Sequence, residues 1–432
     1  MQKINNLISR TKKFPKKLTG LPRKKGFNRQ FLRKSCVTLS ILTFIRLGTF
    51  IPVPGIDHLY VANYIQNSPI ANFVNTFSGG GIFVIGLFTL NIFPYINASI
   101  LMQVLVSALP NLEKLQKEEG ASGKQKITQL TRLICLGWAI IQSTTIALFL
   151  KTILFDWNYF LATEIIISLT TGAMIVLWLS EIITESGIGN GPSLLIFMNI
   201  VSNLPNLSRS LFEGQNNIWF LRTIVSVILF TAISGIIYLQ EGTRIIPLLS
   251  AKELNKENKS NLSKNYIPLR LNQAGVMPII FTATILVLPA YLVNLNIFSF
   301  SKFLFISKFS KVFYWIAYFS FILLFSSFYS TIVLNPQDMS NNLRKQAVTI
   351  PGIRPGKQTT YFLKQTMKRI NYIGAFLLAI LTTLPNVLGL VGNNSNIKGL
   401  GTTSLLIIIG VIIETLREIR SLLLTNRYDD MK

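Results

Sequence analysis

Ten apolar segments, most of them about as long as a bilayer is thick, constrain this chain more than any other feature. A helix needs about 20 apolar residues to cross the hydrocarbon core. Only 14% of the residues are charged, against about 25% in an average soluble chain. The sequence therefore predicts an all-α membrane protein with ten transmembrane helices. They lie near residues 35–52, 85–109, 131–151, 164–184, 190–205, 218–239, 273–293, 312–334, 370–389 and 402–424.

Positive charge is distributed unevenly between the two sides of the predicted membrane. If the N-terminus is cytosolic and all ten segments cross, that side holds 34 of the 42 Lys and Arg residues, and the opposite side holds seven. This bias obeys the positive-inside rule and predicts that both termini lie on the cytosolic side, which is the stroma in a plastid. The net charge of +25 lies in loops between apolar runs, which argues against a nucleic-acid-binding protein.

The ten segments divide into two halves of five around the loop 240–272. An odd number in each half makes the second half enter from the opposite side, so we expect two inverted five-helix halves around a central pore. The predicted parts are a basic arm (1–34), the first six spans (35–239), a basic loop (240–272), spans seven and eight (273–334), a second basic loop (335–369), the last two spans (370–424) and a tail (425–432).

Residues 77–103 are apolar but contain residues that interrupt helices or need polar partners. Lipid offers no partner for a freed backbone group, so such a segment predicts a broken helix that faces protein or a water-filled cavity. The fifth span opens with three glycines, at positions 187, 189 and 191, which indicates a second interruption. The interrupting residues of the first segment are Gly79, Gly80, Gly81, Asn91, Pro94 and Asn97.

The sequence contains no motif of a hydrolase, metalloprotease or nucleotide-binding protein. We therefore expect no enzyme activity, no cofactor and no metal site. Glu181 and Glu185 could form a proton or ion site, although carboxylates at the membrane interface are the simpler interpretation. Glu414, inside the last apolar run, is the best candidate for a buried carboxylate. Carboxylates near mid-membrane are few, which disfavours the main alternative, a secondary transporter with inverted repeats.

Seven stretches, in order and at spacings that fit ten spans, resemble the SecY family of protein-conducting channels. The resemblance covers about residues 35–425. The stretches are 50–57 (FIPVPGID), 93–100 (FPYINASI), 123–129 (GKQKITQ), 184–191 (TESGIGNG), 272–278 (NQAGVMP), 351–356 (PGIRPG) and 401–407 (GTTSLLI).

The resemblance implies an hourglass-shaped channel that moves unfolded, signal-bearing precursors across the membrane and releases hydrophobic segments sideways into lipid. A ring of apolar side chains would form its waist, and such a collar can close on itself and exclude water. Without the resemblance, ordinary helix packing would explain these residues. Pro192 and Met277 replace the isoleucine common in the family, and Ser186 stands where arginine is frequent. The ring positions are Ile92, Ile96, Ile188, Pro192, Met277 and Ile407.

Two further elements are implied by the resemblance. A plug helix would occupy about residues 71–81, although a plain external loop is the alternative. A lateral gate would lie between the second and seventh spans. The expected plug residues are Asn72, Phe73, Asn75, Phe77, Ser78, Gly79 and Gly80. The expected gate residues are Asn97, Gln103, Gln273 and Thr282.

The family also implies partners that dock on the two long basic loops. The resemblance implies a SecA-type motor ATPase, the ribosome and a SecE-type subunit, with or without a SecG-type subunit, besides the precursors and the bilayer. Solvated loops that obey the positive-inside rule are the alternative. Abundant Lys, Asn, Ile and Phe favour a plastid-encoded protein of an algal thylakoid over one of a bacterial inner membrane. The docking residues expected are Arg244, Arg344, Lys345, Arg354 and Lys357.

Overall fold

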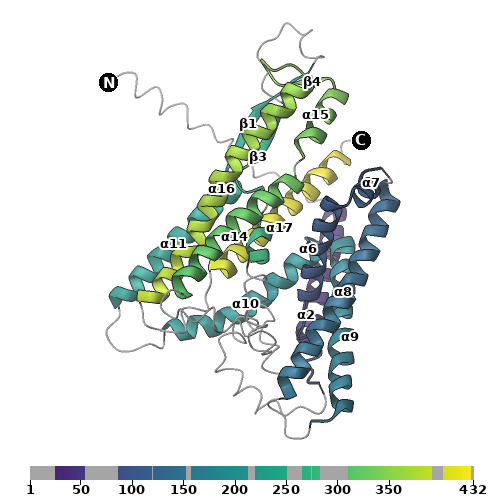
Figure 1. Cartoon of the computed structure of the whole chain (residues 1–432), viewed down its shortest axis with the longest axis vertical. Coiled ribbons are helices and arrows are strands. Elements are labelled where there is room, and N and C mark those ends of the chain that lie inside the picture. Colours follow the sequence, from purple (N-terminus) through teal and green to yellow (C-terminus); the bar gives the residue numbers. More distant parts are fainter. Residues whose placement is uncertain are drawn as a thin grey trace.

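The computed structural model describes residues 25–53, 86–118, 120–151, 157–212, 219–250, 265–273, 275–282, 310–333, 335–391 and 402–429. Long helices dominate these ranges (Figure 1). The helices are α2 (Lys25–Gly48), α6 (Phe93–Ala108), α7 (Pro110–Glu118), α8 (Gly120–Lys151), α9 (Tyr159–Ser186), α10 (Gly191–Phe212), α11 (Trp219–Glu241), α14 (Ser310–Val333), α15 (Pro336–Lys345), α16 (Lys357–Val391) and α17 (Thr402–Asp429).

Each predicted span except the seventh coincides with one of these helices. Of the seventh span, the structure describes residue 273 and residues 275–282, where positions 277–282 form a helical turn. Within the described ranges, Gly120–Leu148 and Tyr159–Ser186 are each apolar over a length that crosses a bilayer. Several helices extend beyond the predicted apolar segments. The largest extension is that of α16, which begins at Lys357 rather than near residue 370.

The helices form two bundles that α10 connects (Figure 1). In the first bundle, α8 packs against α6, α7 and α9, and α2 packs against α9. In the second bundle, α16 packs against α11, α14 and α17. Helix α10 contacts α9 of the first bundle and α17 of the second. Two packed groups of helices therefore contain spans of the predicted first and second halves, and the fifth predicted span, α10, contacts both groups.

The second span is broken, as its asparagine and proline residues predict, whereas Gly79, Gly80 and Gly81 lie outside the described residues. Residues 87–92 form successive turns, and α6 begins only at Phe93, with Pro94 in its first turn. Proline suits this place because the first helical N–H groups have no partner inside the helix. Asn91 has a φ of 46°, a conformation that asparagine tolerates better than most residues. At its other end, α6 meets α7 at an angle of 105°.

The glycines before the fifth span lie in the connection between α9 and α10 rather than inside a broken span. Helix α9 ends at Ser186, residues 187–189 bend, and α10 starts at Gly191. The Thr184 hydroxyl accepts a hydrogen bond from the Gly191 N–H at 3.0 Å. A side chain at position 191 would clash with the Ser180 carbonyl oxygen. The predicted interruption is therefore a tight, hydrogen-bonded corner.

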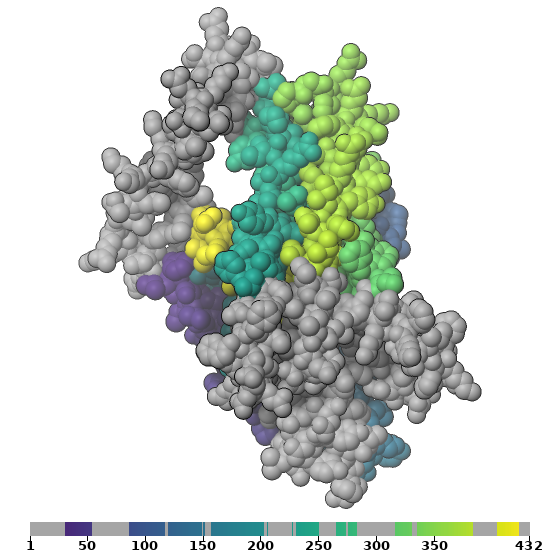
Figure 2. Space-filling model, turned by 90° about the vertical axis from the view of Figure 1, so that its left-hand side faces the viewer, coloured from purple at the N-terminus to yellow at the C-terminus, as the bar shows by residue number. Residues whose placement is uncertain are grey.

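The two long basic loops fold together into one module. Strand β1 (Thr243–Pro247) pairs antiparallel with β3 (Tyr266–Arg270), and β2 (Leu249–Ser250) pairs with β4 (Val348–Thr349) of the other loop. Side chains from both loops share one apolar core with the first turns of α16, namely Ile246, Leu248, Leu269, Leu343, Ile350, Leu363, Met367 and Ile370. Figure 2 shows the module as adjacent teal and light-green atoms at the upper end of the molecule.

The module changes the interpretation of the loop 240–272. This segment was predicted as a basic loop, whereas its described residues include the strands Thr243–Pro247, Leu249–Ser250 and Tyr266–Arg270. The sequence of β1, TRIIP, shows little alternation of polar and apolar residues, and only Ile246 is buried in it. The pairing of β2 with β4 joins Leu249 to Thr349 of the other loop, a contact between distant segments that local sequence patterns do not reveal.

Candidate functional site

A close-packed apolar cluster lies where the two bundles meet. It joins Ile92 and Ile96 of the second span to Ile407 of α17, and Met277 packs against it. The exposed fractions are 2% for Ile92, 7% for Ile96 and 1% for Ile407. Four of the six predicted ring positions therefore belong to one buried cluster that is drawn from both halves. A collar of this composition excludes water and ions as long as it stays closed.

The other two ring positions lie at the corner before α10. Ile188 is buried, and Pro192 in the first turn of α10 is half-buried. Within the described residues, neither is a member of the cluster, although Leu194 and Leu195 of the same helix contribute to it. The structure thus brings Ile92, Ile96, Met277 and Ile407 together and leaves Ile188 and Pro192 beside them.

The broken second span sets the position of Ile92 and Ile96. The Asn91 side chain accepts a hydrogen bond from the Ile92 N–H at 2.8 Å, which satisfies a donor just before α6 begins. The Ile96 N–H donates to the Ile92 carbonyl at 3.1 Å. This first turn stacks the two isoleucines on one face of the helix, since residues four apart are neighbours on a helix surface.

The predicted gate residues fall on both sides of a seam between α6 and the second bundle. Gln103 on α6 lies close to Tyr329 of α14. Oε1 of Gln103 is buried, and no described residue donates a hydrogen bond to it. A buried amide oxygen without a hydrogen-bond donor costs free energy. The unpaired Gln103 oxygen therefore makes this seam less stable than a helix contact whose polar groups are all hydrogen-bonded.

Gln273 and Thr282, on the opposite side, are tied to the second bundle. The Gln273 side chain accepts a hydrogen bond from the Ser330 hydroxyl at 2.9 Å. The Thr282 hydroxyl is fully buried and donates to the Pro278 carbonyl of its own turn. Asn97 is half-buried on α6. The gate residues therefore do not form one direct network. Helix α14, which was not among the predicted gate elements, contributes Tyr329 and Ser330 to the seam.

Tyr329 and Ser330 are the seam residues that sequence reasoning missed. The ring of Tyr329 lies 5.8 Å from that of Phe281 in an edge-to-face contact, and Ser330 pairs with Gln273. A signal was present, because residues 325–331 (FSSFYST) carry several hydroxyl groups inside an apolar run. Polar groups in a membrane helix usually face protein rather than lipid.

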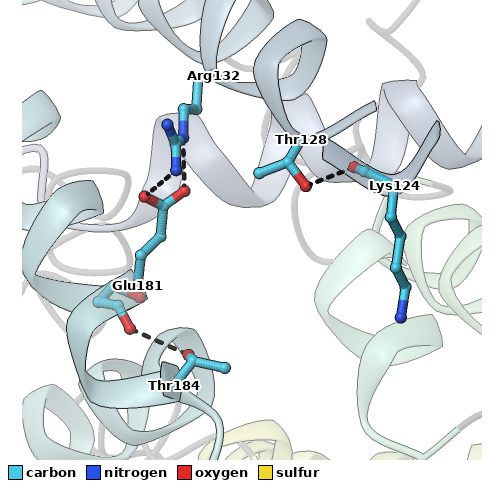
Figure 3. A network of polar contacts seen from close by, with 6 residues as sticks. Lys124, Thr128, Arg132, Glu181 and Thr184 are labelled. Atoms are coloured by element: carbon cyan, nitrogen blue, oxygen red, sulfur yellow. Dashed lines mark hydrogen bonds and ion pairs between the residues drawn. The ribbon is translucent and has the colours of Figure 1, made fainter. Parts of the chain in front are cut away.

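A polar network near the corner between α9 and α10 connects three helices. Arg132 of α8 makes two parallel contacts with the Glu181 carboxylate of α9, Nε to Oε1 at 2.9 Å and a terminal nitrogen to Oε2 at 2.8 Å (Figure 3). One turn further along α9, Thr184 bonds to Gly191 of α10. Because Arg132 already binds the Glu181 carboxylate, the arrangement favours the interfacial interpretation of Glu181. Glu185 is exposed.

The prediction that Glu414 is a buried carboxylate is wrong. Glu414 is exposed on α17, and it lies near Arg270 of β3 and Arg417 of the same helix. Arg417 also contacts Glu241 at 2.9 Å. Glu414 therefore lies among charged groups near the basic module, because the uncharged part of this run ends at residue 413 and Arg417, Glu418 and Arg420 follow within two turns.

The five predicted docking residues are exposed on the module. Arg244 lies on β1, and Arg344 and Lys345 end α15. Arg354 lies at the tip of a turn between Gly352 and Gly356, both of which have positive φ. The Thr359 hydroxyl donates to the Arg354 carbonyl, and the Ser340 hydroxyl donates to that of Gly356. These bonds hold the arginine outward on a fixed turn. The predicted plug at 71–81 lies outside the described residues.

Comparisons with known proteins agree with this architecture. The SecY family model matches residues 86–416. A "Protein translocase subunit SecY" from Trieres chinensis is 54% identical over 417 residues, covering 93% of this chain and 97% of the relative. One from Porphyra purpurea is 46% identical over 398 residues, with coverages of 91% and 96%.

Solved structures give the same fold. The structure titled "The structure of a protein conducting channel" aligns with a TM-score of 0.61 at 19% identity, covering 94% of this chain and 95% of that one. This likeness confirms the predicted all-α channel fold of ten membrane helices. It does not support a separate transporter architecture. On the family model and the identity to these relatives, the chain belongs to the SecY family of protein translocase subunits.

Proposed function

We propose that this chain is the channel subunit through which unfolded, signal-bearing precursors cross the membrane and from which hydrophobic segments move into lipid. The observation that supports this most strongly is the buried cluster of Ile92, Ile96, Met277 and Ile407, which is drawn from both halves at their interface. Separation of the halves would open this cluster, and its apolar side chains would bind no particular sequence. Family membership supports this function over the secondary transporter.

The six-residue ring is proposed as the constriction, with Ile188 and Pro192 joining it when a chain passes. Met277 is half-buried, and its flexible side chain suits a collar that must adapt to different residues. The segment 71–81 is proposed as a plug on the opposite side of the ring from the basic module. Its glycines and asparagines would let it leave its seat.

Lateral release is proposed at the seam between α6 and the second bundle. The Gln103–Tyr329 contact crosses this seam, whereas the Gln273–Ser330 bond stays within the second half. Interhelical polar contacts in membranes contribute about 1 kcal/mol each. An apolar signal helix can offset their loss by burying its own surface.

The basic module is proposed as the docking surface for the partners that supply energy. A SecA-type motor or a translating ribosome would contact Arg354 and the neighbouring basic residues, and a SecE-type subunit, with or without a SecG-type one, would complete the complex. One related structure is titled "Sec61 in the Canine ribosome-channel complex from the endoplasmic reticulum" and aligns with a TM-score of 0.56. Algal relatives support a plastid thylakoid membrane. The uneven distribution of Lys and Arg favours both termini in the stroma.

A stalled precursor tests the constriction directly. Cysteine is introduced singly at positions 92 and 407, and at position 412, which is exposed on the outer side of α17. A precursor with one cysteine in its mature part is then halted in the channel by a folded domain. Disulfide formation with positions 92 and 407 but not with 412 is expected. Equal reaction at all three positions would refute a central path.

A further inference from the structure

An open apolar groove lies between α14 and α16, away from the seam and the ring. It has a volume of about 450 Å³ and is lined by Leu323, Tyr372, Ile373, Phe376 and Leu377. Its α16 side chains are strongly exposed, with fractions of 53% for Tyr372 and 57% for Ile373. In a membrane, a groove of this kind is filled by lipid chains or by another apolar molecule.

The groove has fixed walls because α14 and α16 are joined beside it. The Asn371 side-chain amide donates to the Ser326 carbonyl at 3.3 Å. The rings of Phe319 and Phe376 meet edge to face at 6.0 Å. Leu323 lies between these two contacts along α14 and is less exposed than the α16 side chains, so it forms the floor.

Positive charge continues the same face of α16 toward the basic module. Nζ of Lys368 lies 5.9 Å from the centroid of the Tyr372 ring, and Lys364 is exposed one turn further. Helix α16 carries no acidic residue. Within the described residues, no carboxylate forms an ion pair with either lysine. Along this face of α16, Lys364 and Lys368 are therefore followed by Tyr372 and then by the apolar groove, all within a few turns.

We propose that this face is a binding site for one anionic phospholipid. Lys364 and Lys368 would contact the phosphate, Tyr372 would lie at the level of the headgroup, and an acyl chain would fill the groove over Leu323. Basic pockets at the ends of membrane helices bind anionic headgroups in this way, and tyrosine favours the interface. The acyl chain of a zwitterionic lipid would fill the groove equally well, but its headgroup has no net negative charge to pair with the two lysines.

Native mass spectrometry of the full chain with its small partner subunit tests the site. The complex is released from nanodiscs that contain equal phosphatidylglycerol and phosphatidylcholine, and the retained lipid is counted. Lys364→Gln with Lys368→Gln should lower phosphatidylglycerol retention on the order of tenfold, since each basic residue near the surface contributes appreciably. Lys114→Gln with Lys124→Gln makes the same charge change on exposed residues of the first half and should leave retention unchanged.

The groove itself is tested by filling it. Leu323→Trp and, separately, Leu377→Trp should displace the lipid while both lysines remain; Leu377 is 41% exposed, so its replacement needs no interior space. Added glycerol phosphate should not displace the lipid, because the acyl chain anchors it. Equal retention in the charge variant and its control would overturn the proposal. So would unchanged retention in both Trp variants, or displacement by glycerol phosphate.

Discussion

The Arg132 guanidinium and the Glu181 carboxylate meet in a two-point contact that joins α8 to α9 (Figure 3). Arg132 is half-exposed, with a side-chain fraction of 49%, and Glu181 is more buried at 22%. A pair in this setting contributes about 1 kcal/mol or less. Its position beside the α9–α10 corner makes it a support for the first bundle.

Charge reversal at this pair should be destabilising singly and tolerated together. Arg132→Glu places two carboxylates side by side and is expected to lower the thermal midpoint of the purified complex by a few degrees. Arg132→Glu with Glu181→Arg should recover most of the loss. The measurement is a thermal-shift assay in detergent. A double variant as unstable as the single one would show that the contact does not matter as a pair.

Gly172 of α9 lets that helix approach the turns that precede α6. A methyl group there would clash with the Leu87 carbonyl oxygen, so Gly172→Ala should separate α9 from the turn that positions Ile92. We expect reduced stability and slower translocation. Gly137→Ala is the matched control, since a Cβ at that helical glycine meets nothing nearby; it should be neutral or stabilising by about 0.5–1 kcal/mol. Equal effects of the two changes would contradict this account.

The second span shows what local sequence could predict. Asn91 and Pro94 mark the start of α6 because their chemistry acts within one turn of the chain, and the break lies where they indicate. The pairing of Gln273 with Ser330 could not be predicted in this way, since it depends on how two distant segments pack. The same holds for Arg132 with Glu181, where each residue alone resembles an ordinary interfacial charge.

The ring should act as a seal in the resting channel. Ile407→Asn buries an amide in the apolar cluster and should admit water, so that ions leak across vesicles in the absence of any precursor. Ile412→Asn changes an exposed residue of the same helix and should not leak. The readout is dissipation of an imposed membrane potential. If vesicles that contain the Ile407→Asn channel keep their membrane potential, residues outside this cluster form the seal.

Linking the two sides of the seam should block lateral release. Gln103→Cys with Tyr329→Cys, joined by a short reducible crosslinker, is expected to stop membrane insertion of a signal helix until the link is cleaved. Gln273→Cys with Ser330→Cys joins residues of the same half and should leave insertion intact when linked. If a signal helix still inserts while positions 103 and 329 are crosslinked, the lateral exit for signal helices lies elsewhere in the channel.

Arg354→Glu should uncouple the motor from the channel. The turn holds this residue outward, so reversal of its charge is expected to abolish ATP-dependent transport while the protein still assembles in the membrane. Arg420→Glu makes the same change on an exposed residue of α17 and should retain most activity. Similar losses in both would indicate a general effect of charge rather than docking at the turn.

Signal-dependent transport in sealed vesicles is the direct test of whether the chain forms a protein-conducting channel. The chain is reconstituted with a SecE-type subunit, a SecA-type ATPase and a precursor, and protection of the precursor from added protease is measured. A protein-conducting channel is expected to give protection that requires ATP and disappears when the signal is deleted. Absence of protection, together with accumulation of a small solute against its gradient, would contradict the channel function.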